Sequence, residues 1–497
     1  MLYRKHGTGY YIKSLPCWAK TRSRRLTHAN KFMKKDISRI TTRVLLTLVL
    51  TVSLCGIVIQ AQTPNEVVLH SFSGAATHDG SSPYGGLVLG ADGVFYGATW
   101  SGGTNAAGTV FRINADGSGY AVLRSFTWSP DGEGPCGGLI QGSDGAFYGE
   151  TQFGGTSNQG SVFMINTNGT VYKELYSFTN TPDGANPDGG LVQGGDGALY
   201  GTTAYGGTTN AGTVFKINTD GSGYSVLHSF SNTPDGSNPL TGLTLGMDGA
   251  LYGVAGGGVN LVGTVFTINT NGAGYSVIHN FTGYYGGLSP EAALIQGGDG
   301  TLYGTTVGGG TNGCGTVFKV STNGSGFALL HTFSNSPDGA YPYGGLMLAS
   351  DGALYGTTSS GGKTNAGTLF KVNPDGSGYS VLYHFTGTNG DGANSHASLA
   401  GKAAGVFYGT TLNKGTSGFG TIFRFALSPT LKLAGSKPAA LQGTVTGFSS
   451  QSCLIQASTN LIDWGEFTNL VLTNGIGQFT DSAATNGSRR FYRALVQ

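Results

Sequence analysis

The chain has 497 residues, of which 89 are glycine, 10% are charged and 11% are aromatic. The glycines follow no Gly-X-Y period, which excludes collagen, and the aromatic residues recur at regular places, which argues against a disordered chain. Twelve of the 27 Lys and Arg residues and one of the 25 acidic residues precede Gln62. The remainder therefore carries 15 bases against 24 acids, and this balance argues against nucleic acid as a partner.

Residues 1–61 are predicted to be an N-terminal extension with a signal peptide. A basic segment, "KKDISRITTR", precedes the apolar run Val44 to Ile59, and Ala61 offers a small residue for cleavage. Translation starts at Met1 or Met33. We therefore expect a secreted or cell-surface protein. The alternative is an uncleaved membrane anchor, because the apolar run is only slightly shorter than a membrane span.

The cysteines do not form a recognisable framework. Only Cys136, Cys314 and Cys453 follow the leader, and they are odd in number, far apart and without metal-ligand spacing. We expect buried or inert thiols, no metal site and no cofactor.

A repeat occupies most of the chain. The segment "GDGALYGTTAYGGTTNAGTVF" (195–215) has close copies, whose Tyr-Gly pairs lie 51 to 53 residues apart. A period near 50 without a helical pattern is typical of propellers and solenoids. The tyrosines of these pairs are Tyr96, Tyr148, Tyr200, Tyr252, Tyr303, Tyr355 and Tyr408.

Each copy contains four candidate strands. In the third copy they are 190–194, 198–203, 212–218 and 224–230, and Asp196-Gly197 and Asp220-Gly221 join the first pair and the last pair. Asp-Gly between strand residues predicts tight hairpins with primed turns, which need positive φ. Four antiparallel strands per copy are the composition of a propeller blade.

The ends of the array predict a closed ring. The seventh copy lacks a fourth strand, whereas an additional fourth strand, Val67 to Phe72, precedes the first copy. If this N-terminal strand completes the last blade, no sheet edge is left open. We therefore predict an all-β fold: a seven-bladed β-propeller over residues 62–428, closed by its N-terminal strand.

The repeat resembles the GloVer tandem repeat of exported bacterial proteins. Residues 66–425 carry "GG-L-x-x-G-x-DG-x-LYG-T" followed by "GG-T-N-x-GTVFK" in seven copies. The resemblance implies export and repetition, and it implies no activity. The seventh copy departs from the pattern, because Ala404 replaces the hairpin aspartate; we expect its turn to be less tight and its blade to be the weakest.

Residues 429–497 are predicted to form a small β-sandwich. The repeat stops after Pro429, and the segments "CLIQASTNLIDW" and "RRFYRALVQ" alternate as strands do. This region looks like the β-sandwich tail of related exported proteins, and Trp464 and Phe491 are its expected core.

Two other series of polar residues have structural explanations. Histidines recur at one position of the fourth strand, one per copy, and so they cannot converge on one metal. Aspartates recur in "D-G-x-x-P" and are better explained as turn caps than as calcium ligands, because they are not clustered. These residues are His70, His228, His279 and His331, and Asp79, Asp131, Asp183, Asp235, Asp338 and Asp391.

The candidate site is a ring of residues that differ from copy to copy. Strand order places the "GGTTNAG" loops and the "TPDGANP" loops on one face, and the residue that ends the second loop borders the channel. Around the ring this residue is Tyr84, Cys136, Asp188, Leu240, Glu291, Tyr343 and His396. Tyr84, Asp188, Glu291, Tyr343 and His396 could bind a sugar by hydrogen bonding and stacking.

These observations favour a non-enzymatic binding or scaffold protein, exported or at the cell surface and monomeric. Its propeller face would bind an extracellular glycan or a protein partner. The alternative is a polysaccharide-active hydrolase or lyase that uses Asp188, Glu291 and His396 as acid and base. A purely structural surface-layer role and unremarkable loop variation at the ring are the remaining possibilities.

Overall fold

The computed structural model describes residues 66–434, 440–485 and 490–496. The predicted signal peptide lies outside these residues. The described chain is all-β, as predicted, apart from the 3-10 helices η1 (Ala75–Thr77) and η2 (Ser482–Thr485). No helix in these ranges is long and apolar enough to cross a membrane.

Seven four-stranded antiparallel sheets account for the repeats in the described residues, and we number them by the copy that supplies their inner strand. Sheet 1 contains β3 (Val88–Leu89), β4 (Phe95–Thr99), β6 (Thr109–Ile113) and β7 (Ala121–Ser125). Sheet 2 contains β8 (Ile140–Gln141), β9 (Phe147–Thr151), β10 (Ser161–Ile165) and β11 (Tyr172–Ser177). Sheet 3 contains β12 (Val192–Gln193), β13 (Leu199–Thr203), β14 (Thr213–Ile217) and β15 (Ser225–Ser229).

The later copies repeat this order. Sheet 4 contains β16 (Thr244–Leu245), β17 (Ala250–Ala255), β18 (Thr264–Asn269) and β19 (Ser276–Asn280). Sheet 5 contains β20 (Ile295–Gln296), β21 (Leu302–Thr306), β22 (Thr316–Val320) and β23 (Ala328–Thr332). Sheet 6 contains β24 (Met347–Leu348), β25 (Leu354–Thr358), β26 (Thr368–Val372) and β27 (Ser380–His384).

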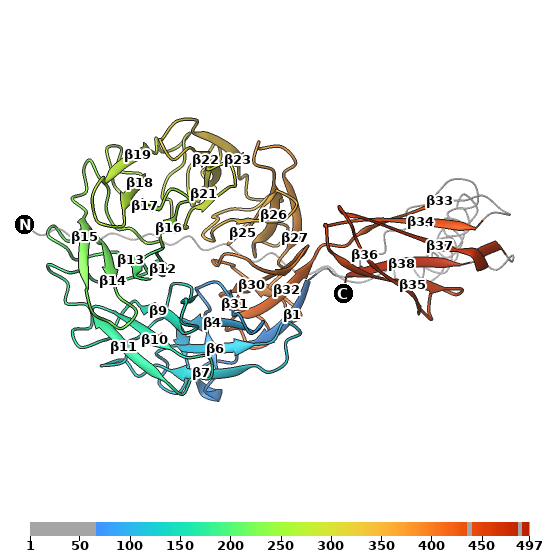
Figure 1. Ribbon diagram of the computed structural model, residues 1–497, viewed down its shortest axis with the longest axis horizontal. Helices are drawn as coiled ribbons and strands as arrows, with labels where there is room; N and C mark the ends of the chain where they lie inside the picture. The colour runs from blue at the N-terminus through green and yellow to red at the C-terminus, as the bar shows by residue number, and fades with distance from the viewer. Residues whose placement is uncertain (1–65, 435–439, 486–489, 497) are drawn as a thin grey trace, which may run out of the picture. The chain divides into compact units, whose positions relative to one another are not determined.

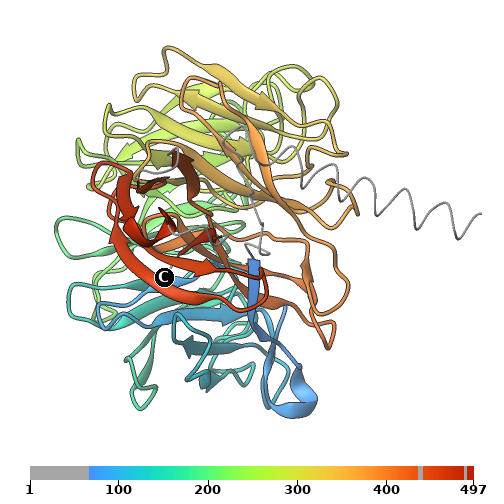
Figure 2. The ribbon, with the colours of Figure 1, turned by 90° about the vertical axis from the view of Figure 1, so that its right-hand side faces the viewer.

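Sheet 7 combines both ends of the array. It contains β29 (Ala400–Ala403), β30 (Val406–Thr411) and β32 (Thr421–Ala426), and its fourth strand is β1 (Glu66–Ser71). Strand β1 pairs antiparallel with β32, as the offset of the copies predicts. The blue β1 lies beside the orange β32 in Figure 1 and again in the side view of Figure 2. Two short pairs, β2 (Gly80–Ser81) with β5 (Ser101–Gly102) and β28 (Gly392–Ala393) with β31 (Asn413–Lys414), belong to loops.

Neighbouring sheets make the same aromatic contact around the array. The phenylalanine after each outer strand packs edge-on against the "GTVF" phenylalanine of the next sheet; Phe178 and Phe215, for example, have ring centroids 5.3 Å apart. Phe72, which follows β1, packs in the same way on Phe111 of sheet 1, at 5.4 Å. Sheets 7 and 1 are therefore neighbours through the contact that joins the other pairs.

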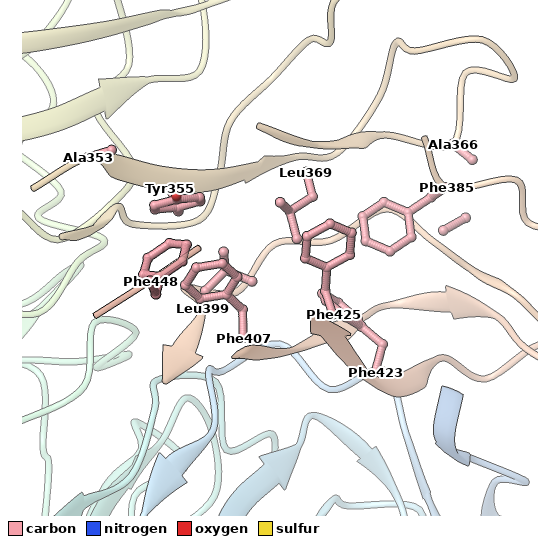
Figure 3. Close-up of a cluster of buried hydrophobic side chains, with 11 residues drawn as sticks. Ala353, Tyr355, Ala366, Leu369, Phe385, Leu399, Phe407, Phe423, Phe425 and Phe448 are labelled. Carbon is pink, nitrogen blue, oxygen red and sulfur yellow. The ribbon is translucent and has the colours of Figure 1, made fainter. Parts of the chain in front are cut away.

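A buried tyrosine supports each of these interfaces. Figure 3 shows the contact between sheets 6 and 7, where the ring of Tyr355 on β25 lies 4.5 Å from that of Phe407 on β30. Phe385 and Phe423 belong to the same buried cluster, with ring centroids 5.2 Å apart. The glycine after the tyrosine is required by packing. A Cβ at Gly97 would lie 2.6 Å from Phe111 Cζ.

The inner hairpins are three-residue connections, and our expectation of primed turns is wrong. Gly194 N–H donates to Ala198 O and Gly197 N–H donates to Gly194 O, and only the second residue of Asp196-Gly197 has positive φ, at 79°. A turn followed by one left-handed glycine explains the Asp-Gly signal equally well. The aspartate also accepts a hydrogen bond from the buried tyrosine: Tyr200 Oη lies 2.8 Å from Asp196 Oδ2.

The hairpin of sheet 7 contradicts the expectation of a looser turn. Ala403 pairs with Val406, so only Ala404 and Gly405 form the connection, and β29 is longer than the other inner strands. The additional residue is absorbed by a register shift between Gly401 and Ala403. Without the aspartate that holds the three-residue loop, the strands pair further and the extra residue becomes a bulge.

After residue 428 the chain forms a second set of strands. Strand β33 (Thr430–Ala434) is followed by β34 (Leu441–Thr446), which pairs with β37 (Ile476–Asp481). Strand β35 (Ser452–Ser458) pairs with β36 (Gly465–Val471) on one side and with β38 (Phe491–Val496) on the other. The predicted core is wrong in detail. Trp464 and Phe491 are only half-buried, and Val445, Cys453, Ile455 and Leu472 are fully buried instead.

Candidate functional site

The loops that lead from each outer strand to the next inner strand approach one another closely, and we call them the lead-in loops. Small residues follow the variable position of each loop. At Gly189 a Cβ would lie 2.1 Å from the carbonyl carbon of Thr241 in the next loop, and at Gly137 it would lie 2.4 Å from the nitrogen of Gly190. Glycine here lets neighbouring backbones meet, which brings the variable side chains toward one another.

The variable residues of the seven copies line one cavity of about 200 Å³, which we call the ring cavity. The lead-in loops share this face with the loops between the second and third strands, as predicted, because Ala185 and Tyr205 form a backbone bridge. The five predicted site residues are brought together, and Cys136 and Leu240 also lie in the wall. The variable residues in the wall are Tyr84, Cys136, Asp188, Leu240, Glu291, Tyr343 and His396.

One side of the ring cavity is aromatic. The ring of Tyr343 stacks on His396 with centroids 4.2 Å apart and an interplanar angle of 11°, and Tyr84 meets His396 edge-on at 5.2 Å. His396 Nε2 lies 3.0 Å from Ser359 Oγ, and its Nδ1 is buried without a partner. Burial lowers the pKa of His396 to about 4, so the imidazole is neutral at pH 7.

The other side is acidic. Burial raises the pKa of Asp188, and burial together with the charge of Asp188 raises the pKa of Glu291. The same two effects raise the pKa of Tyr84 to about 12. The two carboxyls therefore share one poorly hydrated space, where the charge of Asp188 disfavours the ionised form of Glu291.

A chain of side chains from the preceding loops orients Asp188. Gln152 Nε2 donates to Asp188 Oδ2 at 3.3 Å, and Trp100 Nε1 donates to Gln152 Oε1 at 3.2 Å. Trp100 is 37% exposed, so part of its ring faces solvent. Our sequence analysis missed Gln152. The signal for Gln152 is its position, three residues after the glycine of the Tyr-Gly pair. In another copy Ser359 occupies this position and lies beside His396.

Glu150 was also missed, and it lies behind the cavity wall. It is only 1% exposed; its Oε2 accepts a hydrogen bond from Gly190 N–H at 2.9 Å, and its Oε1 has no partner. Burial raises the pKa of Glu150 to about 8, with a smaller contribution from Asp188 and an opposing one from the Gly190 N–H. The signal for Glu150 is that four other copies have threonine at this position, namely Thr202, Thr305, Thr357 and Thr410.

The recurring aspartates and histidines bind each other, which supports their structural interpretation. Asp235 accepts a hydrogen bond from Ser231 N–H, and its Oδ2 lies 3.0 Å from His228 Nε2. Tyr275 stacks on His228 at 3.6 Å and donates to the carbonyl oxygen of Asp235. Arg124 and Tyr176 replace the histidine as partners of Asp131 and Asp183. The described ranges contain no group of three or more potential metal ligands.

The lead-in loop between sheets 4 and 5 lacks this arrangement. Gly286 stands where the aspartate is expected, and Phe327 replaces the tyrosine that would donate to it. His279 still stacks on Phe327, at 3.8 Å, but its Nε2 is buried without a partner. Burial lowers the pKa of His279 with no carboxylate to oppose it.

Restoring the aspartate is expected to stabilise the protein. A Cβ at residue 286 would lie 2.0 Å from Thr282 Oγ1, which must rotate, and the equivalent Ser231 hydroxyl donates to Asp235. Gly286→Asp should raise the free energy of unfolding by ~1–3 kcal/mol, because a buried polar atom gains its partner. It should also raise the pKa of His279.

Urea unfolding and an NMR titration of His279 measure these two effects. Gly286→Ala is the control, because replacing glycine also restricts the unfolded chain. An equal gain from alanine, with an unchanged His279 titration, would contradict the explanation.

Comparison with known proteins identifies the repeat. The sequence matches the Gloeobacter/Verrucomicrobia repeat over residues 52–261 and 245–465. Among curated proteins, none is similar to this chain. Similar solved structures include an oligogalacturonate lyase from Vibrio parahaemolyticus, at 12% identity and a TM-score of 0.46, covering 73% of this chain and 93% of the lyase.

A nidogen/laminin complex is similar at 13% identity and a TM-score of 0.34, covering 51% of this chain and 82% of the matched one. Likeness at this level transfers no activity to the present protein. The match to the family, in contrast, is a match of sequence and spans the repeat array. The chain belongs to the Gloeobacter/Verrucomicrobia repeat family.

Proposed function

We propose that the seven sheets are the blades of a closed seven-bladed β-propeller over residues 62–428, and that residues 429–497 form a β-sandwich domain. The pairing of β1 with β32 supports closure, and so does the contact of Phe72 with Phe111. The pairs β34–β37 and β36–β35–β38 support a two-sheet domain.

The proposed function is that of a non-enzymatic binding or scaffold protein, exported or held at the cell surface. The propeller face with the ring cavity binds an extracellular glycan or a protein partner, and the β-sandwich serves as spacer or attachment. One observation carries this proposal. A position that differs between otherwise similar copies lines a single cavity with Tyr84, Asp188, Glu291, Tyr343 and His396.

The chemistry of the ring cavity suits sugar binding. Carboxylates and tyrosine hydroxyls form hydrogen bonds with sugar hydroxyls, and aromatic rings pack against sugar rings. Repetition builds the blade, whereas a ligand without sevenfold symmetry needs different side chains at equivalent positions. The ring cavity supplies that difference.

A pull-down of the purified protein against soluble and insoluble polysaccharides tests the proposal. We expect saturable binding that the double variant Asp188→Ala/Glu291→Ala loses, with no sugar released into the supernatant. A variant that binds as the natural protein does would remove the ring cavity from the binding site. If neither protein binds any polysaccharide, the glycan proposal fails and protein partners remain.

The second candidate is a polysaccharide hydrolase or lyase with Asp188, Glu291 and His396 in the reaction. The observation that favours it is the pair of carboxyls with raised pKa in one cavity, since a general acid must keep its proton near neutral pH. Sugar release in the same assay, lost in the double variant, would establish this candidate.

A further inference from the structure

The wall of the ring cavity carries two acidic side chains and, among the described residues, no basic side chain to pair with them. Asp188 and Glu291 contribute carboxyls, and of the described residues that line the cavity none is lysine or arginine. His396 is neutral at pH 7 because burial lowers its pKa to about 4. Burial raises the pKa of both carboxyls, and a ligand that carries positive charge would favour their ionised forms and pair with them.

The aromatic side of the cavity suits the same charge. Tyr343 and Tyr84 lie on two sides of His396, so tyrosine rings and carboxyls surround one space. A cation is attracted by the electron-rich face of an aromatic ring, most strongly where water is excluded. Aromatic rings and carboxyls together are the groups that recognise ammonium ions.

We propose that the ring cavity binds an ammonium-bearing sugar, such as an amino sugar at the end of a polysaccharide chain. This inference rests on the proposed binding function and specifies its ligand. The cavity of about 200 Å³ takes one sugar ring, because sites for larger ligands span roughly 300–1,000 Å³. Asp188, held by Gln152, and Glu291 accept hydrogen bonds from the ammonium group.

A sugar fits these surroundings better than a lysine side chain of a protein partner. Trp100 is 37% exposed and is joined through Gln152 to Asp188, so a partly exposed aromatic ring lies two hydrogen bonds away from the carboxyl. The face of such a ring packs against the next ring of an oligosaccharide, whereas a lysine side chain has no ring to place on it.

Calorimetric titration of the purified full chain tests the inference with three probes. They are a glucosamine tetramer, the fully N-acetylated tetramer and a lysine tetrapeptide. We expect the glucosamine tetramer to bind at least about tenfold more tightly than the acetylated one, because acetylation removes the charge-assisted hydrogen bonds. Its affinity should also fall as salt is added.

Variants locate the effect. Asp188→Asn and Glu291→Gln should each weaken binding of the glucosamine tetramer by roughly tenfold. Asp220→Asn, in an exposed hairpin, removes the same charge elsewhere and should leave the affinity unchanged. Thermal melting checks that each variant is folded. The salt dependence is measured on the natural protein, so this test of the charged contact does not depend on any variant folding.

The other outcomes separate the two proposals. Equal binding of both tetramers would overturn the ammonium inference and leave glycan binding in place. Tighter binding of the lysine peptide than of the glucosamine tetramer would overturn the choice of a sugar. Absence of binding by every oligosaccharide, in this titration and in the pull-down, would overturn the proposed glycan-binding function as well.

Discussion

Glu150→Gln is expected to raise the free energy of unfolding strongly in alkaline solution and little in acid. The folded-state pKa of Glu150 is about 8, above its ordinary value of 4.5. Between these values the folded protein holds a proton that the unfolded chain has lost, so stability falls as the pH rises through this range. The full effect corresponds to ~5 kcal/mol above pH 8.

Glutamine removes this dependence because it carries no charge. Its amide oxygen can still accept the hydrogen bond from Gly190 N–H. Urea unfolding of the natural protein and of Glu150→Gln at pH 5, 7 and 9 measures the difference. Glu466→Gln, on β36 at the surface, is the control. Parallel loss of stability in both proteins as the pH rises would show that Glu150 is ionised when folded.

Deletion of Val67 to Phe72 is expected to destabilise the whole array in one transition. Phe72 is fully buried against Phe111, and loss of a buried phenylalanine side chain alone costs about 3–5 kcal/mol. The deletion also leaves β32 as an open edge that invites association with other chains. Differential scanning calorimetry should show a single transition at a markedly lower temperature.

Single substitutions test whether the closing interface equals the others. Phe178→Ala removes the same contact inside the array, and Phe72→Ala removes it at the closure. Equal losses are expected because the two pairs are packed alike. A deleted chain that melts at the temperature of the natural protein would disprove closure by β1.

The sequence predicts the strands well because the same pattern recurs in seven copies, so residues that differ in one copy do not obscure it. The Tyr-Gly pair, the Asp-Gly hairpin and the "GTVF" phenylalanine each have a packing reason, seen at Gly97, Asp196 and Phe215. The turn type was wrong because Asp-Gly fits both a primed turn and a three-residue loop with one left-handed glycine.

The residues of the candidate site also fall into two groups, those that the sequence analysis predicted and those that it missed. The ring of variable residues could be predicted, because strand order alone decides which loop ends meet. Gln152 and Glu150 were missed, since each acts on the lead-in loop that follows its own sheet, and the pattern within one copy does not show this contact. Glu150 also lies on β9, where every residue is buried. An alternation of buried and exposed residues therefore does not single out Glu150 as a buried acid.

Because β1 pairs with β32, the first strand of the array cannot pair until the last strand has been synthesised. A hydrogen bond joins Ser71 to Thr416, which are 345 positions apart in the chain. During synthesis β1 therefore stays without its partner strand until nearly the whole array has been made. Folding with contacts this distant in sequence is slow. A chain that closes late remains unfolded longer, and an unfolded chain is the form that can be threaded through a narrow pore.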